Sequence, residues 1–279
     1  MKTVSLSLFL LCLTLGTLGN LTGVNAQDQD ARKAKDLWEQ VIAAKGGRER
    51  LFTVHNLVVS SQTKYSRPVR GFKEGQFTDL FVLPDKWWSW GNELGLIIWT
   101  YDFGRQVGQE VWEESPALRT YSPTIPLTDK AIVPFDKKDD IRFRFVNRRF
   151  TQNQLIFLME TKWLQPTIVK SWTDRIDFKK VDVIESSYAN QRFEFYIDRK
   201  THLPVQVIIR TRIEQTGRDV LDRFILGDYV EVAGIKFPQK VTRGEKNKTS
   251  YQVNVDYDKS IFERPPTIDM GPDAWKRAR

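Results

Sequence analysis

Residue types that could carry out catalysis are scarce in this sequence. The 279 residues include two histidines, His55 and His202, which lie far apart, and one cysteine, Cys12. Two pairs of adjacent acids, Glu113–Glu114 and Asp139–Asp140, could serve a hydrolase as acid and base, but adjacent acids on a surface loop are mostly solvated. The pattern indicates no histidine-based triad, no zinc site and no cofactor. We therefore expect a protein that is not an enzyme, and a hydrolase is the least favoured alternative.

Aromatic side chains form the most unusual cluster. Trp87, Trp88, Trp90 and Trp99 fall within a short span. Wide, flat side chains can line a groove for an acyl chain or another apolar ligand, and they can equally fill a solid core. Because Trp87 and Trp88 are adjacent, they would face opposite sides of a strand, so a loop must cover one of them or leave it exposed.

A later segment adds alternating apolar residues that predict a hairpin with one buried face. Phe193 and Phe195 alternate with charged and polar residues, and Val205 and Val207 do the same after a turn. The predicted ligand-binding cavity comprises Phe81, Trp87, Trp88, Trp90, Trp99, Tyr101, Phe193, Phe195, Val205 and Val207.

Four arginines form a second candidate site. Arg142, Arg144, Arg148 and Arg149 are interspersed with phenylalanines, and they could contact an anionic head group or a membrane surface. The alternative is a solvated polar face that alternates with buried phenylalanines.

The hydrophobic pattern predicts two helices and many antiparallel strands, which together make an α+β domain. Residues 28–45 and 151–163 have helical spacing, with Thr151 as a possible cap. Residues 115–140 contain four prolines and predict a long loop or lid. Alternation predicts strands over residues 57–64, 76–83, 94–103, 105–113, 192–197, 203–209, 219–230, 235–243 and 251–257.

The N-terminal segment is typical of a secretory signal. Lys2 precedes the apolar run Ser5–Leu18, and Val24–Ala26 offers a small-x-small cleavage site. We therefore expect residues 1–26 to be removed near Ala26 and the mature protein to lie in the periplasm or outside the cell, with an uncleaved anchor helix as the alternative. Cys12 lies inside this signal without a lipobox before it, so we do not expect a lipoprotein.

Charge and the C-terminal residues complete the expectation. The formal charge is +8, and a mild positive balance favours acidic membrane surfaces or anionic head groups. Lysines and arginines are scattered among acids without a dense basic stripe, which argues against nucleic acid. We expect one domain over residues 27–266, because no linker or repeat is evident, and a loose basic tail over residues 267–279.

Three motifs carry a resemblance to a known family. They are the helix stop Gly46–Gly47 with the following residues 48–51, the turn Asp198–Pro204 with Thr201 inside it, and the segment 227–238 around Gly234 with the closing residues 258–265. Each also has a local reason, since Gly234 suits a turn that needs positive φ and Asp198 and Thr201 can bond nearby backbone.

With these motifs the chain resembles the outer-membrane lipoprotein carrier superfamily, which has the LolA-like and LppX-like fold. The resemblance implies a strongly curved antiparallel half-barrel sheet with helices across its concave face. In carriers of this fold the cavity between sheet and helices holds acyl chains. The sequence shows no clear equivalent of the arginine with which such carriers close the cavity.

The resulting expectation is a non-catalytic periplasmic binder or carrier of lipid, acyl chains or a lipidated protein. Possible further partners are an anionic membrane surface and envelope proteins. The main alternative is a structural or interaction protein of the envelope, in which the same fold has a solid core.

Overall fold

The computed structural model describes residues 29–69, 72–92, 95–114, 141–213, 217–242, 246–267 and 269–277. The expected signal peptide and the whole of the expected loop over residues 115–140 lie outside the described residues. Within the described residues, no helix combines the length and apolar composition needed to cross a bilayer.

Two antiparallel sheets of six strands form the body of the described structure. The first has the order β12 (Lys246–Val253), β1 (Asn56–Val69), β2 (Phe72–Val82), β3 (Lys86–Gly91), β4 (Gly95–Asp102) and β5 (Val107–Glu114). The second has the order β11 (Ile235–Thr242), β10 (Arg218–Val232), β9 (Pro204–Ile213), β8 (Gln191–Asp198), β7 (Lys179–Tyr188) and β6 (Thr167–Ile176).

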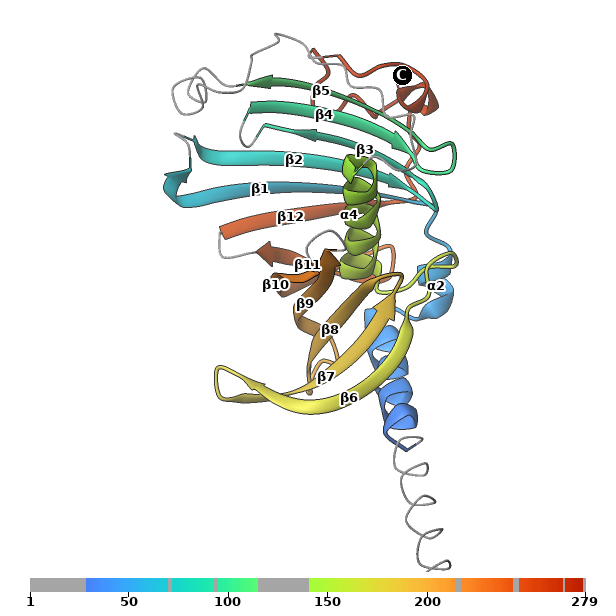
Figure 1. Cartoon of the computed structure of the whole chain (residues 1–279), viewed down its shortest axis with the longest axis vertical. Coiled ribbons are helices and arrows are strands. Elements are labelled where there is room, and N and C mark those ends of the chain that lie inside the picture. Colours follow the sequence, from blue (N-terminus) through green and yellow to red (C-terminus); the bar gives the residue numbers. More distant parts are fainter. Residues whose placement is uncertain are drawn as a thin grey trace, which may run out of the picture.

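The two sheets meet where β11 runs beside β12, and together they form an open, curved wall (Figure 1). At this junction the side-chain amide of Asn247 on β12 exchanges hydrogen bonds with the backbone of Val241 on β11. The α+β class and the curved antiparallel architecture are therefore confirmed, although the wall is divided into two sheets where the sequence suggests one bent sheet.

In the part of the chain that the structure describes, two helices cover the concave side. The N-terminal helix, over residues 29–45, packs Trp38 edge-on against Phe195 of β8, with ring centroids 5.5 Å apart. The long helix α4 (Ile141–Leu158) crosses in front of the first sheet and ends near β11 (Figure 1). Phe150 and Phe157 of α4 both contact Phe81 of β2, at 5.9 and 6.4 Å.

The helix stop at Gly46–Gly47 has a specific packing reason. Gly46 has φ +128, and a Cβ on it would lie 2.2 Å from the carbonyl oxygen of Gly234. Gly234 in turn has φ +74 in the turn between β10 and β11. The glycines therefore let the N-terminal helix, continued by α2 (Arg48–Phe52), approach this hairpin closely.

Lys45 ties the same region together from inside the protein. Its ammonium donates hydrogen bonds of 2.6 Å to the carbonyl oxygens of Phe157 and Lys236, which belong to α4 and β11. Burial lowers the pKa of Lys45 to about 7, because a charged ammonium loses its hydration there.

Several boundaries differ from those that the sequence predicts. Helix α4 begins at Ile141 and not at Thr151, so Thr151 lies inside the helix and is no cap. The sequence also missed β3, β6 and β7. The alternation of arginine and phenylalanine over residues 142–145 hides the helix, because it has the period of a strand, and within the helix Phe145 is exposed whereas Phe150 is buried.

The C-terminal segment is packed, whereas the sequence suggests a loose tail. Trp275 is 3% exposed, and its carbonyl oxygen accepts a hydrogen bond from the backbone of Asp258. Together with Ile261 and Phe262 of η1 (Lys259–Phe262), it covers the convex face of the first sheet. The buried Trp275 and the backbone hydrogen bond from Asp258 fix this segment in place, although its charged composition alone predicts disorder.

Candidate functional site

A groove of about 460 Å³ lies between the concave face of the first sheet and helix α4. The floor comes from β1 to β4 and consists of Val59, Ser61, Thr63, Phe77, Asp79, Trp87, Ser89 and Trp99. The roof comes from α4 and consists of Phe145, Arg149, Asn153 and Phe157. The side toward the second sheet consists of Phe224, Val241, Thr242, Asn247 and Thr249.

Strand alternation explains which side chains reach the groove. On β1, Leu57 and Val59 face the concave side, and Ser61 and Thr63 continue this parity into the groove. The intervening Val58 faces the convex side and packs under the C-terminal segment. Ser61 and Thr63 point toward α4 but are too small to reach it, so the space between β1 and the helix stays open at these two positions.

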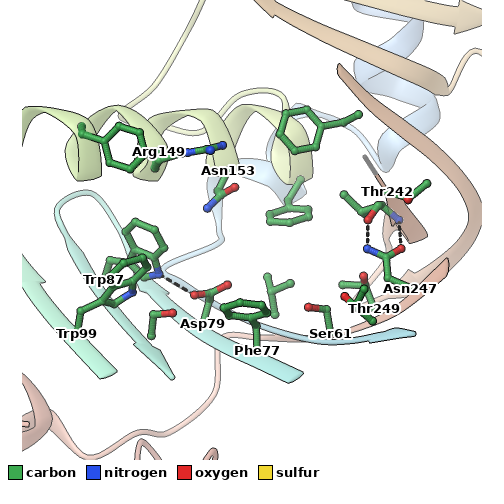
Figure 2. A pocket seen from close by; sticks show the side chains of 17 residues that line it. Ser61, Phe77, Asp79, Trp87, Trp99, Arg149, Asn153, Thr242, Asn247 and Thr249 are labelled. Atoms are coloured by element: carbon green, nitrogen blue, oxygen red, sulfur yellow. Dashed lines mark hydrogen bonds between the residues drawn. The ribbon is translucent and has the colours of Figure 1, made fainter. Parts of the chain in front are cut away.

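One end of the groove is aromatic. The indoles of Trp87 and Trp99 meet edge to face at 5.2 Å, and Trp87 stacks on Phe81 at 5.5 Å. Figure 2 shows both indoles on the floor, across the groove from the helix that carries Arg149. Phe145 of α4 also lines the groove and is 43% exposed, which places it at the opening.

The other end of the groove is polar and uncharged. Thr242, Asn247 and Thr249 gather there, at the junction of β11 and β12 (Figure 2). The amide of Asn247 is occupied by the backbone of Val241. These groups can accommodate a polar portion of a ligand without offering a charge.

Among the described residues, two charged side chains line the groove. Arg149 of α4 lies 3.8 Å from Asp222 of β10, so its charge is balanced by a neighbour on the second sheet. Asp79 of β2 accepts a hydrogen bond of 3.0 Å from the indole of Trp87, and Ser89 donates a second. Burial raises the pKa of the Asp79 carboxyl to about 6, although the bonds from Trp87 and Ser89 lower it in part.

The predicted cavity residues fall into three sets. Trp87 and Trp99 line the groove. Five others belong to the concave core but are sealed beneath the helices, and none lines the groove: Phe81, Tyr101, Phe193, Phe195 and Val207. Their role in ligand binding stays a prediction.

The remaining three predicted cavity residues lie on the other side of the sheets. Trp88 and Trp90 pack on the convex face of the first sheet beneath Trp275. Val205 packs on the convex face of the second sheet with Tyr196 and Ile208. Strand alternation explains Trp88 and Trp90, because each is one position away from a groove residue, Trp87 or Ser89. Val205 has the same parity as Val207 of the concave core, but the β8–β9 pairing shifts register between Tyr196 and Ile197, and this irregularity turns Val205 to the other face.

Of the predicted head-group arginines, Arg149 is the one that lines the groove. Arg148 and Arg149 lie over the ring of Phe145, at 5.3 and 5.4 Å from its centroid. Arg144 is exposed on the same helix, and the side chain of Arg142 lies outside the described part. A helix, and not the alternating strand that the pattern allowed, presents Arg148 and Arg149 beside Phe145 at the opening.

Of the residues considered for catalysis, the structure describes the side chains of the two histidines, and these lie on different elements. His55 packs against Trp163 at 6.4 Å, while His202 lies in the turn between β8 and β9. Asp139 and Asp140, and the side chains of Glu113 and Glu114, lie outside the described part. In the ranges that the structure describes, no group of three or more metal-binding side chains is present.

The sequence reasoning missed Asp79, Asn153 and Phe157 as groove residues. A signal for Asp79 was available, because it lies between Phe77 and Phe81 on the same parity of one strand. An acid inside an apolar stripe is unusual and marks a candidate functional position.

No protein-family model matches the chain, and no curated protein is similar to it in sequence. Among solved structures, a Vibrio parahaemolyticus domain named for outer membrane lipoprotein sorting is 9% identical, with a TM-score of 0.37, over 83% of this chain and 97% of that one. A LolA superfamily protein from Nitrosomonas europaea is 10% identical, with a TM-score of 0.41, over 77% of this chain and 94% of that one.

A third similar structure is the MucA/MucB complex of Pseudomonas aeruginosa, at 10% identity and a TM-score of 0.23, over 82% of this chain and 60% of that one. The solved structures that this chain resembles thus include LolA superfamily proteins, the group whose motifs its sequence also resembles.

Proposed function

We propose that the groove under α4 binds one apolar chain, such as the acyl chain of a lipid or of a lipidated protein, without covalent chemistry. The observation that carries the proposal is the hollow itself. Around Phe193 and Phe195 the concave face is filled by the protein's own side chains, whereas about 460 Å³ beside Trp87 and Trp99 is left open.

The dimensions and the chemistry of the groove suit such a ligand. Its volume equals that of about 15 water molecules, and it falls in the range of ordinary small-molecule sites. Each methylene that leaves water for the groove gains about 0.8 kcal/mol. An inserted chain of about ten methylenes would therefore gain about 8 kcal/mol before the costs of association are subtracted.

The opening offers contacts for whatever stays outside. Phe145 is exposed there, and Arg148 and Arg149 lie over its ring. An anionic head group or membrane surface would meet these cations, while the apolar chain lies between Trp99 and Phe157. The exported location indicated by the N-terminal sequence would make envelope lipids and lipidated proteins the available ligands.

The experiment is a plugging substitution with a matched control on the same strand. Ser61 lines the groove, and the adjacent Gln62 is exposed on the opposite face of β1. Ser61→Phe should fill the floor, whereas Gln62→Phe adds the same ring outside the groove. Each protein is purified from an exporting host, extracted with organic solvent and examined by mass spectrometry, and binding of 1-decanol is measured by calorimetry.

We expect lipid in extracts of the unchanged protein and of Gln62→Phe, and loss of both lipid and decanol binding in Ser61→Phe. If none of the three proteins binds decanol or carries lipid, the carrier proposal is wrong and the solid-core interaction protein replaces it.

A further inference from the structure

The groove contains one acid whose charge is not balanced. In the ranges that the structure describes, the charged residues that line the groove are Asp79 on the floor and Arg149 on the roof. Arg149 has Asp222 as its partner. The groups that act on Asp79 are the indole of Trp87 and the hydroxyl of Ser89, both neutral donors.

The position of Asp79 makes this acid available to a ligand. Its carboxyl rises from the floor beside Trp87 and points toward the space below Asn153 (Figure 2). Phe77 flanks it on the same strand, and Trp99 lies behind Trp87. An ionised carboxylate in such apolar surroundings repels anions strongly and attracts cations, because little water screens it.

From this geometry we infer that Asp79 selects the polar group of the bound chain: the groove accepts a cationic or neutral amphiphile and rejects an anionic one whose charge must enter the floor. The inference rests on the proposed function and sharpens it. Free fatty acids would be poor ligands at neutral pH, whereas amines, alcohols, amides and esters would be accepted. Anionic head groups could be held only at the opening, by Arg148 and Arg149.

Protonation supplies an internal control for the inference. With a pKa of about 6, Asp79 is mostly charged at pH 7.5 and mostly neutral at pH 5. The other charged groups facing the groove are Arg149 of α4 and its partner Asp222 of β10. Discrimination by charge should therefore weaken as the pH falls through about 6.

The test uses three amphiphiles with the same ten-carbon chain: decylammonium, 1-decanol and decyl sulfate. Neither charged probe changes its protonation between pH 5 and 7.5. Binding to the full chain is measured by calorimetry at both pH values. Asp79→Asn removes the charge and keeps an oxygen for the indole of Trp87. Glu74→Gln is the matched control, because this substitution also removes one negative charge from β2. Glu74 is exposed and pairs with Lys64, so it lies outside the groove.

At pH 7.5 we expect decylammonium to bind about tenfold or more tightly than decyl sulfate in the unchanged protein and in Glu74→Gln. The difference should fall to about threefold or less in Asp79→Asn. At pH 5 it should shrink in the unchanged protein and in Glu74→Gln, which both keep Asp79, but not in Asp79→Asn. Equal discrimination in Asp79→Asn, or tighter binding of decyl sulfate by the unchanged protein, would overturn the inference.

Two further outcomes separate this inference from the proposed function. If decanol binds but charge makes no difference, Asp79 does not select the ligand and the groove remains a binding site. If no probe binds, decanol included, both are wrong. Should Asp79→Asn fail to fold, the pH series on the unchanged protein and on Glu74→Gln decides, because an unaltered preference at pH 5 contradicts a role for Asp79.

Discussion

The two sheets of this protein are covered on opposite faces. The second sheet is filled on its concave side, where Trp38 of the N-terminal helix meets Phe195. The first sheet is covered on its convex side, where Trp275 and the residues around η1 pack over Trp88 and Trp90. On its concave side α4 packs Phe150 against Phe81, and the groove stays open beside this contact, beneath the same helix.

The contrast shows how similar strand patterns can build a solid region and a hollow one. Both sheets alternate aromatic and polar residues, so each can bury only one face fully unless a second layer is added. Because the first sheet is packed on its convex face, its strands can stay in place although the groove on its concave face is not filled. We conclude that the C-terminal segment supports the groove from outside.

The largest expected effect is in the filled half. Phe195→Ala should lower the free energy of unfolding by about 3–5 kcal/mol, because Phe195 is fully buried against Trp38 and Phe193. Urea denaturation followed by circular dichroism measures this loss. A loss under about 1 kcal/mol would mean that the second sheet is not filled as described.

The C-terminal segment that covers the convex face of the first sheet should contribute nearly as much to the free energy of unfolding. Trp275→Ala should cost about 2–4 kcal/mol in the same denaturation experiment, because the indole covers the convex face with Ile261 and Phe262. Decanol affinity should also fall, since the floor of the groove loses its backing. A normal free energy of unfolding would contradict the role given to the C-terminal segment.

Lys45 joins the two halves, and its effect depends on pH. Lys45→Met leaves the carbonyl oxygens of Phe157 and Lys236 without their donor, and at pH 9.5 it should cost about 1–3 kcal/mol. In the folded state burial lowers the pKa of Lys45 to about 7, so between about pH 7 and 10 the unfolded chain holds more protons.

Stability of the unchanged protein should therefore rise with pH over that interval relative to Lys45→Met. Chemical denaturation of both proteins at pH 7, 8 and 9.5 measures the difference. A difference that stays constant from pH 7 to 9.5 would show that Lys45 stays charged when folded.

The smallest effect on stability is expected in the hollow half. Trp99→Ala should cost only about 1 kcal/mol, because the indole is partly exposed toward the groove and leaves no sealed cavity behind. Decanol affinity should nevertheless fall by about tenfold. Calorimetry and urea denaturation on the same variant separate the two effects, and a large loss of stability with unchanged affinity would assign Trp99 to the core.

Local patterns predicted the fold better than they predicted the groove. Alternation identified most strands, and the turns at Asp198 and Gly234 form as their residue types require. The sequence could not show which aromatic residues line a hollow, because Trp87 and Trp88 are equivalent in composition and differ only in which face receives a covering layer. That layer comes from Trp275, almost two hundred residues away along the chain.

The most direct test of the central claim is to locate a bound chain. A crystal of the protein with 10-bromo-1-decanol would show the bromine by its anomalous scattering. We predict one strong peak inside the groove, between the indoles of Trp87 and Trp99 and the ring of Phe157. A groove filled by the protein's own side chains, or bromine found only on the outer surface, would contradict the account.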